Sequence, residues 1–199
     1  MSPFAGISYH HLMRTGVARA GFILVGGRSS RMGRDKALLP LDGSTLVEVL
    51  AGHLKIAAKT VTLIGPPERY EALGFPVVAD SVEPCGHLGG VYTALSVTPA
   101  AWNLIIACDL PGLTADFVEN LFLAAEANEA DCVVPEGARG VEPLCAVYHR
   151  RCRSHAASAI ARKKFKMHDF VSSLHAVTLP VSDFSPLMNA NTPEEWANR

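Results

Sequence analysis

A glycine-rich, basic segment near the N-terminus carries the clearest chemical signal in this sequence. It runs from Gly21 to Lys36 and reads GFILVGGRSSRMGRDK, so an apolar stretch meets two glycines and four cationic side chains follow. Glycine lets backbone N–H groups converge on an anion without a Cβ atom in the way. Arginine and lysine add charge-assisted hydrogen bonds to phosphate oxygens. The segment therefore predicts a phosphate-binding loop after a buried strand, in preference to a surface turn with solvated charges.

The spacing within this loop excludes two common phosphate-binding motifs. In a Walker loop the lysine directly follows the last glycine, whereas two residues separate Gly33 from Lys36. The dinucleotide-binding fingerprint has a residue between its first two glycines, whereas Gly26 and Gly27 are adjacent. The loop is therefore of a third kind.

A carboxylate that could hold a metal ion follows the clearest central strand of the sequence. Residues 102–108 read WNLIIAC, and Asp109 comes directly after them. Open α/β sheets bind ligands at the carboxyl ends of their strands. A bound triphosphate is usually accompanied by Mg²⁺, which prefers carboxylate oxygens. We therefore predict that Asp109 is a Mg²⁺ ligand; the alternative is an aspartate that forms a turn with its own backbone.

The remainder of the chain alternates apolar stretches with helix-like segments, as expected of a sheet covered by helices. No internal repeat or low-complexity linker interrupts this alternation, which indicates one α/β domain. Residues 137–140 join two apolar stretches without a helix between them, which predicts a hairpin and a strand that runs antiparallel in a mixed sheet. The predicted strands are 22–25, 61–64, 76–79, 102–108, 130–135, 143–148 and 175–179, and the predicted helices are 46–57, 91–97, 150–160, 167–174 and two that begin near 114 and 193.

Length and composition fit such a domain and limit the classes of function. The 199 residues are 49% hydrophobic, which suffices for a core without disulfide bonds or a structural metal. The net charge of -1 argues against general nucleic-acid binding, and no apolar stretch reaches the roughly 18 residues of a membrane span. Five cysteines without a CxxC pair indicate a reducing compartment. We expect a cytoplasmic protein with its domain in 19–199, after a poorly ordered tail, 1–18, that is no signal peptide.

Two further groups of polar residues could contact a ligand. Arg162, Lys163 and Lys164 lie in a basic cluster, which is either a solvated surface or a second anion site. Asn189 and Asn191 precede a helix start marked by a capping box, and they are either turn formers or amide ligands. The residues alone leave both choices open.

Taken together, these motifs resemble those of a known family. The pattern L-x-G-G-x-S-x-R-M-G-x-D-K-A-L, from Leu24 to Leu38, is similar to that of the molybdenum cofactor guanylyltransferases, which belong to the nucleotidyltransferases. This resemblance implies a Rossmann-like α/β nucleotidyltransferase fold, a single domain with a mixed, mainly parallel sheet and the nucleotide over its carboxyl edge. Later segments that resemble family motifs are ADS at 79–81, HLGG at 87–90, CDLP at 108–111, EPLCAVY at 142–148 and NANTPEE at 189–195.

The resemblance also implies roles for individual residues. Lys36 matches the lysine that contacts the triphosphate, Asp80 matches a nucleotide contact, and Asp109 matches the Mg²⁺ ligand. Arg31 and Lys36 would hold the leaving β- and γ-phosphates. The residues that match the nucleotide-binding segment of the family are Leu24, Val25, Gly26 and Gly27, and Arg28 and Ser29 are expected to bind the nucleotide beside them.

The implied reaction transfers GMP from GTP to the terminal phosphate of molybdenum cofactor, or molybdopterin. Its products are molybdopterin guanine dinucleotide and pyrophosphate. The phosphate of the pterin would meet Arg162, Lys163 and Lys164, while Asn189 and Asn191 would orient this substrate. GTP, Mg²⁺ and molybdopterin are therefore the expected ligands, and proteins that deliver the cofactor or receive it are the expected transient partners.

Three alternatives to a guanylyltransferase remain, two of them enzymes and one a non-catalytic protein. Related enzymes that use CTP resemble this chain but tend to have Ala-Gly where Gly26-Gly27 stands, which favours guanine. The family often has an asparagine after the second strand, and this chain has Gly65-Pro66-Pro67 instead. The enzyme alternatives are a molybdopterin cytidylyltransferase and a sugar-phosphate nucleotidyltransferase with the same loop. The third is a non-catalytic cofactor chaperone, which the presence of Lys36 and Asp109 argues against.

Overall fold

The computed structural model describes residues 19–26, 35–82, 84–137, 139–190, 195 and 196. The expected tail, 1–18, and most of the helix expected from 193 lie outside these residues, so both remain predictions.

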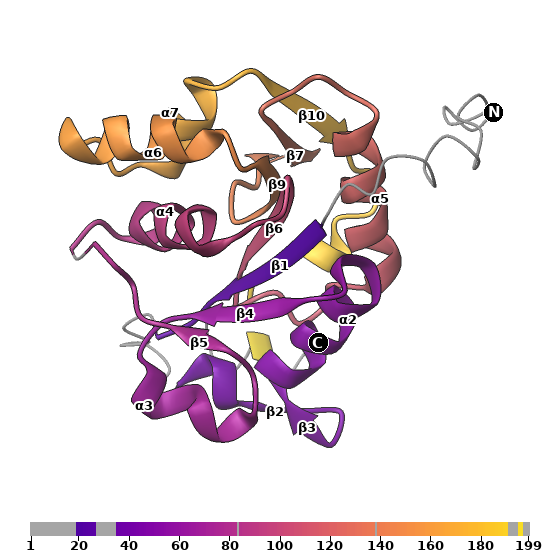
Figure 1. The fold of residues 1–199 in the computed structure, drawn as a ribbon. Coiled ribbons are helices and arrows are strands. Elements are labelled where there is room, and N and C mark those ends of the chain that lie inside the picture. Colours follow the sequence, from indigo (N-terminus) through magenta and orange to yellow (C-terminus); the bar gives the residue numbers. More distant parts are fainter. Residues whose placement is uncertain (1–18, 27–34, 83, 138, 191–194, 197–199) are drawn as a thin grey trace.

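One large sheet runs through the middle of the molecule (Figure 1). Its strands are β1 (Arg19–Leu24), β4 (Val61–Ile64), β5 (Val77–Val78), β6 (Trp102–Ala107), β7 (Cys132–Gly137), β8 (Gly140–Val141), β9 (Cys145–His149) and β10 (Ala176–Pro180). The order is β10-β7-β9-β6-β1-β4-β5, with β8 paired to β7. Strands β6, β1, β4 and β5 run parallel, whereas β9 is antiparallel to both of its neighbours. The predicted mixed, mainly parallel sheet is therefore confirmed, including its antiparallel strand.

Helices cover both faces of this sheet (Figure 1). They are α2 (Leu46–Ala58), α3 (Pro67–Tyr70), α4 (His87–Val97), α5 (Ala115–Glu126), α6 (Cys152–Ala161) and α7 (Met167–Ser172), with 3-10 turns η1 (Lys36–Leu38), η2 (Glu71–Leu73) and η3 (Ser185–Leu187). Helices α2 and α5 contribute to one core cluster, and α4, α6 and α7 contribute to another.

Both faces of the central strands are buried because successive side chains point to opposite sides. In β1, Ile23 packs with the α2 and α5 side, while Phe22 packs with the α4 and α6 side. In β6, Leu104 packs with the α2 and α5 side, and Ile105 packs with the α4 and α6 side. This double burial explains why these strands are continuous apolar stretches in the sequence.

A small hairpin that we did not predict follows η1. Its strands are β2 (Pro40–Leu41) and β3 (Ser44–Thr45), and they pair antiparallel. The turn residues Asp42 and Gly43 both have positive φ, 49° and 82°. Positive φ at both positions is typical of a type I′ turn, for which Asp-Gly is a favoured sequence. The dipeptide could therefore have revealed this hairpin.

Helix α4 begins earlier than the sequence pattern indicates, at His87 rather than at 91. The two glycines of the motif thus lie inside its first turns and do not precede the helix. A Cβ atom on Gly90 would lie 2.9 Å from Leu24 Cδ2, and one on Gly89 would lie 2.7 Å from the Val82 carbonyl oxygen. These glycines allow α4 to pack directly on the end of β1.

The predicted hairpin at 137–140 is confirmed by the pairing of Gly137 with Gly140 across β7 and β8. The chain after β10 covers it, since a Cβ atom on Gly137 would lie 1.8 Å from the Phe184 ring. The Arg139 guanidinium stands 5.8 Å from the centroid of the same ring. The hairpin is therefore packed against Phe184, in the segment that follows β10.

Three of the cysteines are small core residues. Cys132, Cys145 and Cys152 are buried. Burial raises the pKa of the Cys132 thiol to about 12, so it is not a reactive thiolate near neutral pH.

Among the described residues, no helix is both long and apolar enough to cross a membrane.

Candidate active site

The candidate site lies where four parallel strands end at the same edge of the sheet (Figure 1). The register sets Leu24, the last residue of β1, beside Ile64 of β4 and Ala107 of β6. The segments that leave these strands therefore start side by side. They carry the first glycines of the basic loop after β1 and Cys108-Asp109 after β6.

The first glycine of the loop stands in a position that no other residue would fit well. Gly26 has φ of 86°, and a Cβ atom there would lie 2.5 Å from Pro66 Cδ. Val25 donates its N–H to the Ile64 carbonyl at 2.8 Å, and a Cβ atom on Gly65 would lie 2.5 Å from the Val25 oxygen. The ends of β1 and β4 are thus in backbone contact, and this contact fixes the direction in which the loop starts.

Asp109 and Lys36 are close enough to influence each other. Burial raises the pKa of the Asp109 carboxyl, and the positive charge of Lys36 is the strongest of the influences that oppose this. The charge of His87, at the start of α4, also lowers the pKa of Asp109, but by less than Lys36 does. The backbone of Asp109 is also held, because Ala190 donates its N–H to the Asp109 carbonyl at 3.1 Å.

This environment fits a magnesium ion. A buried carboxylate without enough positive charge around it favours the protonated form, and a bound cation would favour the ionised form instead. Mg²⁺ keeps several water ligands and binds through one or two carboxylates together with substrate phosphates. Among the described residues, no group of three or more histidine, cysteine or acidic side chains forms a metal cluster. A carboxylate such as Asp109 therefore suits a magnesium ion that arrives with a nucleotide.

Asp80 follows β5 at the same edge and is tied to α4. Its Oδ1 atom accepts hydrogen bonds from Thr93 Oγ1 at 2.8 Å and from the Val82 N–H at 3.2 Å. A Cβ atom on Gly89 would lie 3.0 Å from Asp80 Oδ2, so this glycine makes room for the carboxylate. The bonds hold Asp80 against the first turns of α4.

The predicted acceptor-binding residues are more dispersed. Arg162, Lys163 and Lys164 are exposed at the end of α6, and no described hydrogen bond or ion pair links their side chains to Lys36 or Asp109. Asn189 is exposed and directly precedes Ala190, which binds the Asp109 backbone. The predicted site residues that lie outside the described part of the chain are Gly27, Arg28, Ser29, Arg31 and Asn191.

One acidic residue near Asp109 was missed by the sequence analysis. Burial raises the pKa of Glu142, the charges of Arg139 and His168 lower it, and Asp109 raises it. Glu142 directly follows β8, so the hairpin brings it to the Asp109 side of the sheet edge. Glu142 is the first residue of the EPLCAVY motif, which could have pointed to it, but we assigned it no role.

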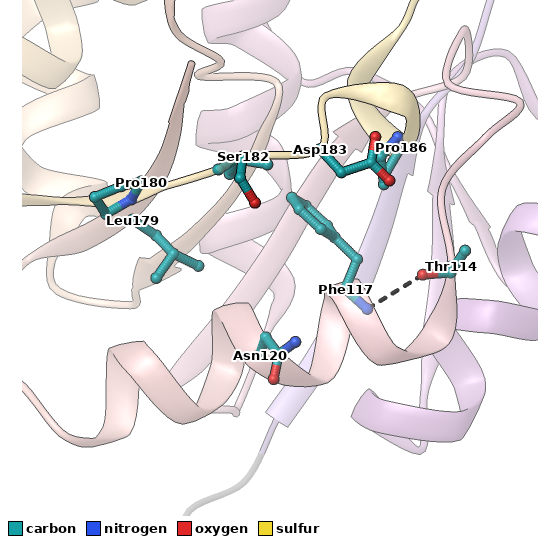
Figure 2. A pocket seen from close by; sticks show the side chains of 9 residues that line it. Thr114, Phe117, Asn120, Leu179, Pro180, Ser182, Asp183 and Pro186 are labelled. Carbon is teal, nitrogen blue, oxygen red and sulfur yellow. Dashed lines mark hydrogen bonds between the residues drawn. The ribbon is translucent and has the colours of Figure 1, made fainter. Parts of the chain in front are cut away.

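A separate groove of about 350 Å³ lies between the first turns of α5 and the segment after β10 (Figure 2). Phe117, Leu179 and Pro186 contribute its apolar wall, and Thr114 Oγ1 accepts the Phe117 N–H at its end. None of the predicted site residues lines it.

A mixed, mainly parallel sheet with a glycine-rich sequence after its first strand and a carboxylate after a central strand is the arrangement expected of an α/β nucleotidyltransferase. The chain belongs to the MobA-like NTP transferase domain family, whose profile matches residues 21–177.

Individual relatives agree with this assignment. A protein from a Nostoc species, described as a probable molybdenum cofactor guanylyltransferase, is 35% identical over 88% of this chain and 87% of its own length. A protein from Carboxydothermus hydrogenoformans with the same description is 34% identical over 87% of this chain and 91% of its own. The crystal structure of molybdopterin-guanine dinucleotide biosynthesis protein A from Archaeoglobus fulgidus superposes with a TM-score of 0.78 at 22% identity, covering 90% of this chain and 95% of that one, and so supports the fold.

Proposed function

We propose that this chain transfers GMP from GTP to the terminal phosphate of molybdenum cofactor, or molybdopterin. The observation that carries this proposal is the proximity of Lys36 and Asp109 at the edge where the glycine-rich loop begins. The descriptions of the relatives supply the identity of the two substrates.

In this reaction an oxygen of the pterin phosphate forms a bond to the α-phosphorus of GTP. The bond from the α-phosphorus to the bridging oxygen breaks, and pyrophosphate leaves with that oxygen. A phosphate monoester has a second pKa of about 6, so it is already mostly a dianion near neutral pH. The protein therefore needs no strong general base, and its task is to position the phosphates and stabilise the leaving group.

The chain's own residues divide this task. Asp109 would hold Mg²⁺, which when bound neutralises charge on the nucleotide phosphates. Lys36 and Arg31 would contact the leaving β- and γ-phosphates. Asp80 would contact the nucleotide from the start of α4. The residues proposed to line the nucleotide are Leu24, Val25, Gly26, Gly27, Arg28 and Ser29.

Two groups of residues are proposed to bind the acceptor. Arg162, Lys163 and Lys164 are proposed to attract the phosphate of the pterin, because they are cationic and exposed. Asn189 and Asn191 are proposed to orient this substrate. Cytoplasmic location, and transient contact with proteins that deliver or receive the cofactor, belong to the same proposal.

Replacement of Asp109 tests the proposal. We expect Asp109→Asn to lower kcat by about 10³-fold or more, because the variant loses the ionised ligand for Mg²⁺. Tm should stay the same or rise, because burial of an ionised carboxylate disfavours the folded state. Asp116→Asn is the matched control, since Asp116 is an exposed carboxylate on α5. Wild-type kcat in Asp109→Asn would remove this residue from the site.

The choice of nucleotide needs a separate measurement. With Mg²⁺ present, GTP should raise Tm more than CTP at equal concentration, because a ligand that binds only the folded state stabilises it. A larger shift with CTP would instead support the molybdopterin cytidylyltransferase alternative. Equal turnover with a sugar phosphate in place of molybdopterin would contradict the assigned acceptor.

A further inference from the structure

A buried tyrosine hydroxyl contacts the motif that contains Lys36. Tyr70 is the last residue of α3, and its side chain is 0% exposed within the α2 and α5 core cluster. Its hydroxyl donates a hydrogen bond of 2.5 Å to Asp35 Oδ2. The residue next to Lys36 is therefore anchored to an element that follows the second strand of the sheet.

The second oxygen of the same carboxylate caps the turn that contains Lys36. Asp35 Oδ1 accepts the Ala37 N–H at 3.1 Å, and Asp35 is the N-cap of η1. Leu39 closes the turn by donating its N–H to the Lys36 carbonyl at 3.1 Å. Ala37 and Leu39, which follow Lys36, are both buried. The backbone of Lys36 is thus fixed from before and after.

The bond to Tyr70 ties this turn to α3, which follows the end of β4 at the sheet edge where Asp109 follows β6. A lysine side chain has a flexible four-carbon stem, so only its backbone start can be fixed by the fold. The position of the Lys36 backbone therefore limits the positions that its ammonium group can reach.

The hydrogen-bond acceptor of the Tyr70 hydroxyl differs from that of Tyr148, the other fully buried tyrosine in the described part of the chain. Tyr148 donates its hydroxyl to the Pro143 carbonyl at 2.7 Å, which shows that a backbone oxygen satisfies such a group in this fold. Tyr70 instead uses a carboxylate, and a charge-assisted hydrogen bond is shorter and stronger. The bond thus does more than satisfy a buried donor.

We propose that Tyr70 and Asp35 are positioning residues, which act through Lys36 to hold its ammonium group on the leaving phosphates of the nucleotide. This inference rests on the proposed function, because it takes Lys36 to contact the triphosphate. It makes α3, which carries none of the predicted site residues, part of the machinery.

A double-mutant cycle tests the inference. Tyr70→Phe removes only the hydroxyl and keeps the ring in the core. We expect it to lower kcat/KM for GTP about tenfold, mainly through kcat, because loose positioning weakens contacts that strengthen as charge develops on the leaving group. In a Lys36→Ala background the same change should lower kcat/KM less than about twofold, since Lys36 transmits the effect.

The control and a second variant keep the inference falsifiable. Tyr148→Phe also deletes a buried hydroxyl, and it should lower kcat/KM by the same factor in both backgrounds. Asp35→Asn has one acceptor oxygen where the fold uses two, so it should reproduce the loss of Tyr70→Phe and supply the readout if that variant does not fold.

The outcomes separate this inference from the proposed function. If Tyr70→Phe changes Tm alone, or lowers kcat/KM equally in both backgrounds, Tyr70 has only a structural role and the inference is wrong. If Lys36→Ala keeps wild-type kcat/KM, or the wild-type protein does not turn over GTP with molybdopterin, the proposed function itself fails.

Discussion

At the scale of single residues, the site depends on positions where only one side chain fits the surroundings. Gly26 combines a positive φ with a contact to Pro66 that leaves no room for a Cβ atom. Asp35 uses both carboxylate oxygens within the fold. Such residues lie next to the proposed ligand contacts, and they fix the backbone from which those contacts extend.

Substitution of Gly26 should be costly for stability. Gly26→Ala introduces both the unfavourable φ and a Cβ atom 2.5 Å from Pro66 Cδ, so we expect a loss of about 1–3 kcal/mol in the free energy of unfolding. Chemical denaturation measures this loss. Gly43→Ala is the matched control, because Gly43 has a similar positive φ of 82° and no atom within 4 Å of its Cβ position. An equal loss in both variants would show that the Pro66 contact contributes nothing.

At the scale of elements, the segments between strands and helices place the proposed contacts. Helix α4 starts beside Asp80 because Gly89 and Gly90 allow close approach. Helix α6 ends in a pair of hydrogen bonds, from the Lys163 N–H to the Ile160 carbonyl and from the Lys164 N–H to the Ala159 carbonyl, both 2.9 Å. With φ of 58° at Lys163, this is a Schellman ending that carries lysine where glycine is usual.

Lys163 therefore allows stability and function to be separated. Lys163→Gly should raise the stability by about 0.5–1 kcal/mol, because glycine adopts the left-handed conformation without strain. If the basic cluster binds the acceptor, the same variant should raise KM for molybdopterin and leave KM for GTP unchanged. Thermal melts and steady-state kinetics measure the two effects. A gain in stability with unchanged KM for molybdopterin would identify the lysine as a solvated surface charge.

At the scale of the whole molecule, polar contacts stabilise the edge of the sheet opposite the candidate site. Asp131 accepts hydrogen bonds from Arg151 Nε at 2.5 Å and from the His175 N–H at 3.0 Å. These bonds join the starts of β7, α6 and β10. On the other core face, Arg19 at the start of β1 pairs with Glu126 of α5 at 2.6 Å. The two sets of contacts stabilise the scaffold away from the proposed chemistry.

The Asp131 contacts predict a pH dependence of stability. Burial would raise the pKa of Asp131, but the hydrogen bonds from Arg151 and His175 outweigh it and hold this pKa below its usual value. A lowered pKa stabilises the fold above the unfolded-state value of about 3.9, and this contribution is lost as the pH falls through the folded-state pKa. Asp131→Asn should therefore lower Tm at pH 7 and approach the wild-type Tm below about pH 4, with kcat unchanged. A Tm difference that is constant over this range would contradict the ionic origin.

The sequence by itself determined the sheet strands, most of the helices and the likeness of the glycine-rich loop to a nucleotidyltransferase motif. These features are local: apolar periodicity, capping residues and turn-forming glycines act over a few neighbouring positions. The largest difference among the strands is at β1, which begins at Arg19 rather than at residue 22. The start of α4 was placed too late, because packing decides helix ends, and the hairpin of β2 and β3 was missed although its Asp-Gly turn signals it.

Only the tertiary structure decided which distant residues meet. The bond between Tyr70 and Asp35, the contact of Gly26 with Pro66 and the approach of Glu142 to Asp109 all depend on the order of strands in the sheet. No spacing rule in the chain specifies that order, because it results from the burial of all elements at once. The sequence therefore indicated the chemistry, and the fold determined how its groups are held.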